Sequence, residues 1–415
     1  MPIIITFKLG KLLVNCRLPT KKLVNKFIVK SFDLKKVEVV VRLVYAHDGI
    51  SNYDKLFLES LRDKYEVYVL TFHRSPNCIP KQVKVVKMRD FIPETTLHPF
   101  EGIRKHFLGP FRAQIFKKNL QRIKPDVLIG CWASTYGFYS AYSHFHPLIL
   151  LIWGSDILVF PKKYFPLKPL IIYSLQKADV VVVDSEVQRQ AAIDLGCKPS
   201  KIVKFPWGDL EGFRRNEAQR RKIRKECGWD ENDIVVISLR SHRTIYGVKY
   251  LIDAIPRVLA KNNNLKFLIL GEGPLTGSFK AKVRDFIERG QVRFVGAVHH
   301  EKIPEYLSAA DIYVSMSFSD GTSASLLEAM ACSLCPVVTE INGNKEWVKD
   351  GVNGLLIPVA DSQTLTDKIL LLAEDNELRS ALGEKAMETV KVRVNWKKNI
   401  QTLTKIIEIF EKTYS

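Results

Sequence analysis

Apolar and polar residues alternate along the chain in short blocks that predict the strands and helices of an α/β protein. Runs rich in β-branched and other apolar residues, typical of strands covered on both faces, occupy 38–45, 66–72, 126–130, 147–153 and 179–185. Segments with helical spacing of apolar residues lie between them. This rhythm of strand, loop and helix predicts a parallel sheet wrapped by helices.

The rhythm begins again after a charged stretch, 214–233, which indicates a second domain. Apolar runs follow at 233–240, 265–271, 292–296, 311–317, 335–340 and 354–358. We expect a helix over 250–260 and two doubly wound sheets in tandem, with a cleft between them, because ligands of such sheets bind beyond the carboxyl ends of the strands. The expected boundaries are 1–36 for a basic extension, 37–210 and 211–394 for the two domains, and 395–415 for a C-terminal helix that packs back on the first domain.

Composition agrees with a two-domain globular protein and excludes other classes. A length of 415 residues with 46% hydrophobic and 26% charged residues is that of a folded protein rather than a disordered one. No apolar run approaches the roughly 20 residues that cross a membrane. Lys8 and Lys11 interrupt the first apolar stretch, so we expect no secretory signal and a cytoplasmic location.

The net charge of +19 is concentrated in the first half of the chain. Residues 1–210 hold 33 lysines and arginines against 17 acidic residues, and residues 1–36 hold nine against one. Such a surface attracts an anionic membrane, a lipid-linked phosphate or nucleic acid, and charge alone does not choose among them. Because no motif combines aromatic and basic residues in the way that reads bases, we do not expect a nucleic-acid partner.

The seven cysteines do not form a disulfide framework, because their number is odd and their spacing irregular. The single C-x-x-C, Cys332 to Cys335, has no second pair and no histidine nearby. We therefore expect buried thiols there rather than a zinc or redox site, and we expect no metal elsewhere.

The most informative stretch is SFSDGTSASLLEAMA, 317–331. Asp320 and Gly321 form a turn after a strand, and Thr322 or Ser323 is expected to cap the helix that follows. Free N–H groups at the start of a helix bind a diphosphate. Glu328 lies eight residues after Asp320, at most about 12 Å along a helix, which matches the reach of a nucleotide sugar from hexose to ribose.

This stretch resembles the E-x7-E motif of the family-4 glycosyltransferases, retaining enzymes with the GT-B fold. The resemblance covers roughly 38–415 and is strongest over 233–360. It implies that Asp320 holds hydroxyls of the donor sugar and that Glu328 binds the nucleotide ribose. Aspartate replaces the usual glutamate, which shortens the reach by one methylene. The alternative is a capped amphipathic helix with a surface glutamate.

The stretch SLRSHRTIYGVKYLIDA, 238–254, resembles the family's loop that supplies an arginine and a lysine to the donor diphosphate. Arg240 matches the arginine, whereas Tyr246 stands at the lysine position. Arg243 could supply the missing cation, and such a cation stabilises the charge that develops on the leaving diphosphate. The alternative is a pair of solvated loop arginines.

Two further turns resemble family motifs. GEGPL, 271–275, matches the turn in which Gly271 and Gly273 let the backbone approach the nucleotide. WGSDIL, 153–158, matches the H-G-x-D turn that faces the donor sugar, with Trp153 in place of histidine. Asp156 could orient a substrate hydroxyl or cap a helix.

On the acceptor side, only Gly49 is left of the family's glycine-rich turn. No paired carboxylates with the placement of a glycosidase are evident, so we name no nucleophile or base. The resemblance implies a metal-independent, retaining glycosyltransferase without a cofactor, moving a sugar from a nucleotide-diphosphate donor to a lipid-linked or polysaccharide acceptor. The basic first half of the chain adds the expectation of a peripheral location at the membrane. A nucleotide-sugar epimerase, a phosphorylase of the same fold and a non-catalytic scaffold or nucleic-acid binder are the alternatives.

Overall fold

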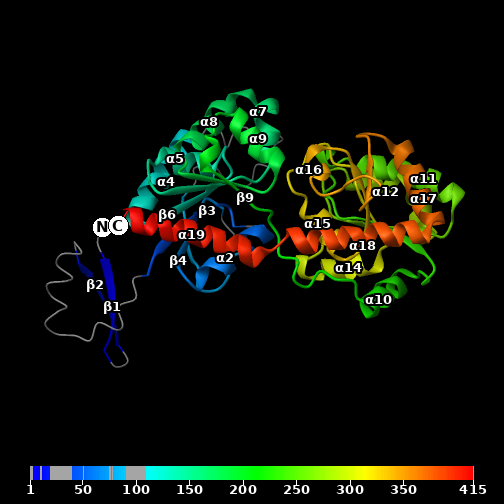
Figure 1. The fold of residues 1–415 in the computed structure, drawn as a ribbon, viewed down its shortest axis with the longest axis horizontal. Coiled ribbons are helices and arrows are strands. Elements are labelled where there is room, and N and C mark those ends of the chain that lie inside the picture. Colours follow the sequence, from blue (N-terminus) through cyan, green and yellow to red (C-terminus); the bar gives the residue numbers. More distant parts are fainter. Residues whose placement is uncertain are drawn as a thin grey trace. The chain divides into compact units, whose positions relative to one another are not determined.

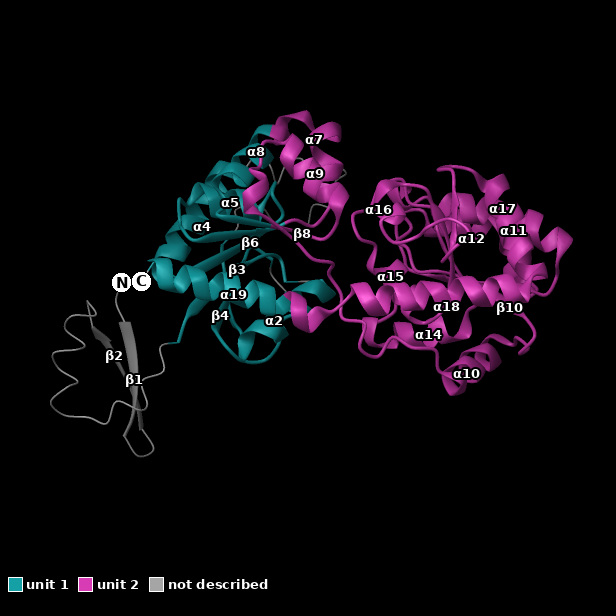
Figure 2. Ribbon diagram, in the orientation of Figure 1, with its two compact units in different colours: residues 1–151, 169–181, 400–415 teal, residues 152–168, 182–399 magenta. Residues whose placement is uncertain are grey.

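The computed structural model describes residues 3–9, 12–18, 40–49, 51–73, 76, 78–89 and 109–414. The chain divides into two compact units, one of residues 1–151, 169–181 and 400–415, the other of 152–168 and 182–399 (Figure 2). Of the predicted basic extension, 1–36, the structure describes only the backbone of two antiparallel strands, β1 (Ile3–Leu9) and β2 (Leu12–Leu18), and its predicted role lies outside the described residues.

A seven-stranded sheet has the order β5-β4-β3-β6-β7-β8-β9, and Figure 1 labels its strands β3, β4, β6 and β9. The strands are β3 (Arg42–Ala46), β4 (Glu66–Thr71), β5 (Lys84–Lys87), β6 (Val127–Cys131), β7 (Leu148–Leu151), β8 (Val180–Val183) and β9 (Ile202–Lys204). The pairs from β5 to β7 are parallel, as predicted. The burial of the strands agrees with a parallel sheet, because β6 and β7 are buried along their whole length, as expected of apolar strands covered by helices on both faces.

The helix between β3 and β4 begins with a local capping signal that the sequence contains. In α2 (Asn52–Arg62), Ser51 accepts the N–H of Asp54 and the Asp54 carboxylate accepts the N–H of Ser51, a complete capping box. The other described helices of the first half are α4 (Gly109–Ile123), α5 (Tyr136–Tyr142), α6 (Ser155–Leu158), α7 (Phe160–Lys163), η2 (Phe165–Leu167), α8 (Lys168–Lys177), α9 (Glu186–Asp194) and η3 (Pro199–Lys201).

A second sheet, six-stranded, has the order β12-β11-β10-β13-β14-β15, and every pair is parallel. Its strands are β10 (Ile234–Ser238), β11 (Leu265–Leu270), β12 (Val292–Gly296), β13 (Ile312–Ser315), β14 (Cys335–Thr339) and β15 (Leu355–Ile357). Each coincides with a predicted apolar run. The chain switches sides between β10 and β13, so the carboxyl ends of these neighbouring strands flank a topological switch point, where open sheets of this type bind ligands.

Helices pack on both faces of the second sheet. They are α10 (Glu217–Cys227), η4 (Thr244–Tyr246), α11 (Val248–Lys261), α12 (Thr276–Lys282), α13 (Arg284–Glu288), η5 (His300–Lys302), α14 (Ile303–Ala309), α15 (Ala324–Ala331), α16 (Asn342–Lys345), α17 (Ser362–Glu374) and α18 (Asn376–Arg393). The last helix, α19 (Trp396–Tyr414), belongs from residue 400 onward to the compact unit of the first sheet. The helix predicted over 250–260 is confirmed as α11. Two Rossmann-like parallel sheets are thus confirmed, whereas the domain boundaries drawn from the sequence stay a prediction. None of the helices in the described part of the chain is long and apolar enough to span a bilayer.

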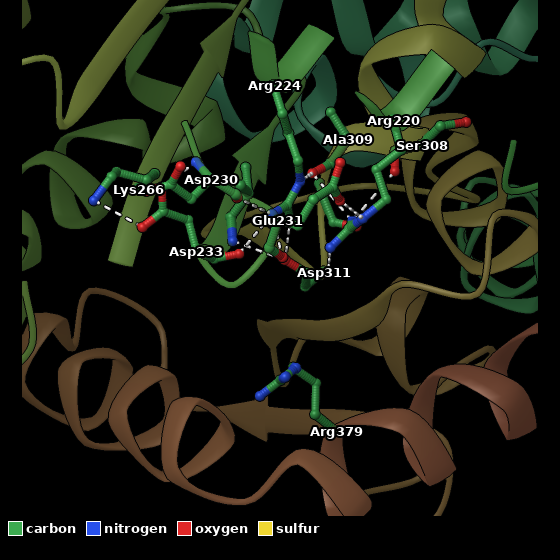
Figure 3. A network of polar contacts seen from close by, with 12 residues as sticks. Arg220, Arg224, Asp230, Glu231, Asp233, Lys266, Ser308, Ala309, Asp311 and Arg379 are labelled. Carbon is green, nitrogen blue, oxygen red and sulfur yellow. Dashed lines mark hydrogen bonds and ion pairs between the residues drawn. The ribbon is translucent and has the colours of Figure 1, made fainter. Parts of the chain in front are cut away.

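The charged stretch 214–233 has a structural function, since it contains α10 and two buried arginines (Figure 3). Arg224 donates to the carbonyl oxygens of Ala309, Asp230, Glu231 and Asp233, and its Nη2 lies 2.8 Å from Asp311 Oδ2. Arg220 Nη2 lies 2.9 Å from the other oxygen of Asp311. The network satisfies backbone carbonyls that would otherwise be buried without partners.

Candidate functional site

The loop between β13 and α15 contains the predicted donor residues Asp320, Gly321, Thr322 and Ser323. Ser323 is the N-cap of α15, but its side chain makes no capping hydrogen bond. The prediction that Thr322 or Ser323 caps the helix through its side chain is therefore wrong. Both hydroxyl groups are used elsewhere, because Ser323 Oγ accepts from Arg240 at 2.7 Å and Thr322 Oγ1 donates to the carbonyl oxygen of Asp184 at 2.7 Å.

Arg240, directly beyond β10, is buried and joins this loop to the neighbouring one. Its Nη2 lies 2.7 Å from Asp320 Oδ2, and its Nη1 donates to Ser323 Oγ and, at 3.1 Å, to Ser325 Oγ. Burial by itself would lower the pKa of Arg240, but the Asp320 carboxylate together with Tyr313 and Tyr246 outweighs burial, so the pKa of the guanidinium is raised and it stays charged. The two residues predicted to hold the diphosphate and the sugar are thus paired with each other.

Tyr246, which stands where the family has lysine, packs its ring against the guanidinium of Arg240, with Cζ 4.3 Å from the ring centroid. The aromatic ring orients the arginine without adding charge. Arg243, at the N-cap of η4, is exposed, and no ion pair joins it to a residue that the structure describes. Of the two arginines predicted for the diphosphate, one is already neutralised and the other is available.

Glu328, eight residues along from Asp320, is the fifth of the eight residues of α15 and is buried. Its Oε1 lies 2.7 Å from His300 Nε2. The ring of His300 in turn contacts Phe213, with centroids 5.4 Å apart. His300 was not among the predicted site residues, and its place shortly after the end of β12 was the available signal.

Gly271 and Gly273 bring the turn after β11 against the loop that carries Arg240. Gly271 has φ +93°, and a Cβ there would lie 2.6 Å from the carbonyl oxygen of Arg240. A Cβ on Gly273 would lie 2.6 Å from the carbonyl oxygen of His242. Both glycines are therefore required by the approach of two loops of the protein, a reason that the sequence motif did not reveal.

Asp184, at the end of β8, is a site residue that the sequence analysis missed. Its Oδ1 accepts the Thr322 N–H at 3.0 Å, so one of the N–H groups predicted to bind phosphate already has a carboxylate partner. Burial raises the pKa of Asp184 to about 7, the Thr322 N–H opposes this, and the Asp320 charge adds to it. The available signal was a carboxylate at the carboxyl end of a buried parallel strand.

Gly321 fits closely against Asp184 and the buried amide of Gln188. A Cβ on Gly321 would lie 2.6 Å from Asp184 Oδ1 and closer still to Gln188 Nε2. Gln188 Oε1 accepts the N–H of Asp184 at 3.0 Å, which turns the amide nitrogen towards Gly321. Any side chain at position 321 would push the donor loop away from the start of α9.

The residues predicted to face the donor sugar from the first domain behave differently from one another. Asp156 is fully buried, and its Oδ1 accepts the N–H of Gly154 at 2.8 Å and that of Trp153 at 3.2 Å. Of its two predicted roles, stabilising the start of a helix is therefore the one the structure describes. Trp153 packs edge-on against Trp207, with ring centroids 5.0 Å apart. Gly49 belongs to the other compact unit and has φ +71°, as a tight turn requires.

Cys332 and Cys335 are buried thiols, as predicted. Burial raises the pKa of each to about 12, which keeps them protonated and unreactive. Within the described ranges, no group of three or more histidine, cysteine and acidic side chains is placed to hold a metal ion.

Two family models match the chain. "Glycosyl transferases group 1" matches residues 219–389, and "Glycosyl transferase 4-like" matches residues 43–185. An uncharacterized glycosyltransferase of Methanocaldococcus jannaschii is 32% identical over 63% of this chain and 68% of its own length. N-acetyl-alpha-D-glucosaminyl L-malate synthase of Bacillus anthracis is 26% identical over 59% of this chain and 62% of its own, so the match spans less than two-thirds of that relative.

Two further comparisons bear on the acceptor and on the fold. N,N'-diacetylbacillosaminyl-diphospho-undecaprenol alpha-1,3-N-acetylgalactosaminyltransferase of Campylobacter jejuni is 25% identical over 83% of this chain and 92% of its own. The structure of HepE from Anabaena in complex with UDP-glucose superposes with a TM-score of 0.72 at 18% identity, covering 88% of this chain and 99% of that one. At this identity, the superposition shows that the fold is GT-B.

Proposed function

Because the chain belongs to the family-4 glycosyltransferases, we propose that it transfers a sugar from a nucleotide-diphosphate donor to a lipid-linked or polysaccharide acceptor, with retention of anomeric configuration. The observation that carries this proposal is the cluster of Arg240, Asp320 and Ser323 at the start of α15, with Glu328 on the same helix. In the family, these positions supply a basic group for the diphosphate, a carboxylate for the sugar and a carboxylate for the ribose. Arg240, Asp320 and Glu328 match these three groups in this order.

The Arg240–Asp320 pair opens when the donor binds. A diphosphate oxygen replaces the Asp320 carboxylate on the guanidinium, and Asp320 becomes free to accept hydroxyl protons of the sugar. Tyr246 holds the guanidinium in place during the exchange. Positive charge is thus delivered where the leaving diphosphate gains negative charge, and the protein does not need to reorganise further.

Arg243 and the first N–H groups of α15 complete the donor site. Arg243 is exposed and can turn towards the β-phosphate, taking the part of the lysine that Tyr246 replaces. The Glu328 carboxylate gives up its contact with His300 and accepts hydrogen bonds from the ribose hydroxyls instead. Because the diphosphate is a good leaving group, the reaction proceeds in this proposal without a metal, a cofactor or an acidic side chain that protonates the leaving oxygen.

The acceptor is proposed from the relatives and from charge. The name of the Campylobacter jejuni relative describes transfer to a sugar carried on diphospho-undecaprenol, and residues 1–210 hold 33 basic against 17 acidic residues. A lipid-linked acceptor would place the enzyme at an anionic membrane surface. In this proposal, residues 37–210 bind the acceptor and residues 211–394 bind the donor.

Thermal denaturation with UDP-, GDP- and ADP-sugars tests the donor site. A ligand present at 100 times its dissociation constant stabilises the folded state by about 2.7 kcal/mol. We expect one base to shift the melting temperature, and Arg240→Ala and Glu328→Ala to abolish the shift. Arg221→Ala, which removes an exposed arginine from α10, is the matched control and should keep it. A shift that survives in both site variants would place the donor elsewhere.

Product analysis with the donor so identified separates the reaction classes. A glycosyltransferase releases the nucleoside diphosphate only when an acceptor is present, whereas an epimerase converts the donor without one and a phosphorylase needs inorganic phosphate. Release of nucleoside diphosphate that depends on lipid-linked sugar would support the proposed acceptor. Conversion of the donor alone would contradict it.

A further inference from the structure

An exposed aromatic side chain lies among lysines in the short segment between α6 and α8. Residues 160–168, FPKKYFPLK, form α7, η2 and the first residue of α8, and we call them the lysine–phenylalanine loop (α7 and α8 are labelled in Figure 1). Phe165 is 76% exposed, more than any other described phenylalanine. The neighbouring Pro166 is exposed as well, so the two residues form a small apolar patch rimmed by lysines, and apolar patches with a polar rim mark protein or membrane interaction sites.

The loop holds Phe165 outward by burying its neighbours. Pro161 and Leu167 are buried and anchor the loop on both sides of the exposed ring. The Tyr164 N–H donates to the Phe160 carbonyl at 2.8 Å, and the Leu167 N–H donates to the Tyr164 carbonyl at 2.9 Å. Because the backbone is already ordered, inserting the ring into a partner costs little conformational entropy.

The charge around Phe165 has one sign. Lys162, Lys163 and Lys168 are exposed, and no ion pair joins them to any side chain in the described ranges. From 157 to 178 the chain contains four lysines and no acidic residue. The flanking acids do not offset this charge, since Asp156 is buried on backbone N–H groups and Asp179 Oδ2 lies 2.7 Å from His146 Nδ1.

We propose that the lysine–phenylalanine loop docks on an anionic phospholipid surface, with Phe165 inserted at the level of the headgroups and the three lysines on lipid phosphates. Aromatic rings prefer this interfacial depth, and lysines near an anionic leaflet add electrostatic attraction. This surface is separate from the proposed donor site, and lipid binding requires no turnover. A failure of one proposal is therefore distinguishable from a failure of the other.

Nucleic acid is the less suitable partner for these residues. Single strands bind where several aromatic faces stack successive bases. Here the neighbouring ring, that of Tyr164, already contacts other side chains of the loop. Phe160 packs edge-to-face against it, and the ammonium of Lys163 lies 5.3 Å from its centroid. Phe165 is left as a single ring next to a proline, which suits insertion between lipids rather than stacking.

Co-sedimentation of the full chain with vesicles measures the effect of charge. The vesicles contain phosphatidylcholine with or without phosphatidylglycerol, at a salt concentration of about 0.1 M, where the Debye length is about 10 Å. Lys162→Gln/Lys163→Gln/Lys168→Gln should lower the partition coefficient on anionic vesicles by on the order of 100-fold, since each lysine contributes roughly a fivefold factor. The matched control removes three exposed lysines elsewhere, Lys225→Gln/Lys261→Gln/Lys391→Gln, and should change the coefficient less than threefold.

Fluorescence quenching then locates the contact independently of the basic extension. The tryptophan fluorescence of Phe165→Trp should be quenched by brominated phosphatidylglycerol more strongly than that of the natural protein, which has six tryptophans. The fluorescence of Val392→Trp, at a position 85% exposed on α18, should be quenched no more than that of the natural protein. Equal quenching of both variants, or equal losses in the two lysine triples, would overturn the proposal. Binding of a single-stranded oligonucleotide that is lost in Phe165→Ser, with vesicle binding unchanged, would also overturn it.

Discussion

Arg240 and Asp320 form a partly buried ion pair, 2.7 Å from Nη2 to Oδ2, between the loops that follow two neighbouring strands of the six-stranded sheet. The pair explains how a carboxylate and a guanidinium are kept ordered before any ligand arrives. It also creates a competition, because a donor diphosphate and a sugar hydroxyl must each take one partner from the pair.

Removing the carboxylate charge should separate donor binding from transfer. In Asp320→Asn, Arg240 loses its counter-charge and meets the diphosphate without competition, so the dissociation constant for the nucleoside diphosphate should fall severalfold. The transfer rate should nevertheless decrease by about 10²–10³-fold, because a charged acceptor of sugar hydroxyls is lost at the reacting end. Isothermal titration and a transfer assay measure the two effects. Weaker nucleotide binding together with an unchanged rate would contradict the assignment.

A methyl group at position 321 should destabilise the protein and displace the donor loop. Gly321→Ala places a Cβ against Asp184 and Gln188, and such overpacking costs about 1–3 kcal/mol in the free energy of unfolding. Gly277→Ala is the matched control, because a Cβ there meets nothing within 4 Å and an alanine favours the helix by roughly 0.5–1 kcal/mol. Urea denaturation measures the free energy of unfolding of both variants. Equal values for the two would contradict the close packing of Gly321 against Asp184 and Gln188.

The contribution of Asp184 to stability should depend on pH in a defined direction. Its pKa is about 7 in the folded protein against an ordinary value of 3.8, so between these values the folded chain binds a proton that the unfolded chain releases. Its contribution is therefore fully present below about pH 4 and is lost as the pH rises through 7.

Asp184→Asn tests this direction, since asparagine keeps an oxygen for the Thr322 N–H without the charge. The stability of the variant relative to the natural protein should increase from pH 4 to pH 7 and then remain constant. Melting temperatures measured across this range provide the comparison. Parallel pH profiles for the two proteins would show that Asp184 does not titrate in this way.

The Arg224 network should be among the most sensitive structural features of the second sheet. Arg224→Met removes the guanidinium donor from the carbonyl oxygens of Glu231 and Asp233 and breaks the ion pair with Asp311, whose Oδ2 keeps only the Val235 N–H. Breaking a buried pair in this way costs roughly 3–5 kcal/mol. Arg221→Met, exposed on the same helix, should change the unfolding free energy by less than about 0.5 kcal/mol. A loss of similar size in both variants would indicate a general effect of removing charge from α10.

The availability of Arg243 predicts an effect on binding alone. Arg243→Gln should weaken nucleoside diphosphate binding by roughly tenfold, as expected for one charge-assisted hydrogen bond, and leave the melting temperature of the free protein unchanged. Arg293→Gln, which removes an exposed arginine from β12, is the control for net charge. Equal weakening of nucleoside diphosphate binding in both variants would show that Arg243 acts only through the net charge of the protein.

Patterns that repeat within a few residues were sufficient to predict the secondary structure. Every apolar run predicted in the second half became a strand of one parallel sheet, because a strand buried on both faces requires such a run and little else. The positions of Arg240, Asp320 and Glu328 were also accessible from the sequence, since the motif places them at strand ends and along one helix. Their proposed roles in binding the donor stay predictions.

Tertiary structure alone decided which of these groups are satisfied by the protein itself. Asp184 is 136 residues from Asp320 in the sequence, and only the fold brings its carboxylate to the N–H of Thr322. The same holds for the aromatic support of Arg240 by Tyr246, for His300 on Glu328 and for the close approach that requires Gly271 and Gly273. Local sequence determines backbone propensity and apolar periodicity, whereas burial, ion pairing and pKa depend on neighbours that are distant in the chain.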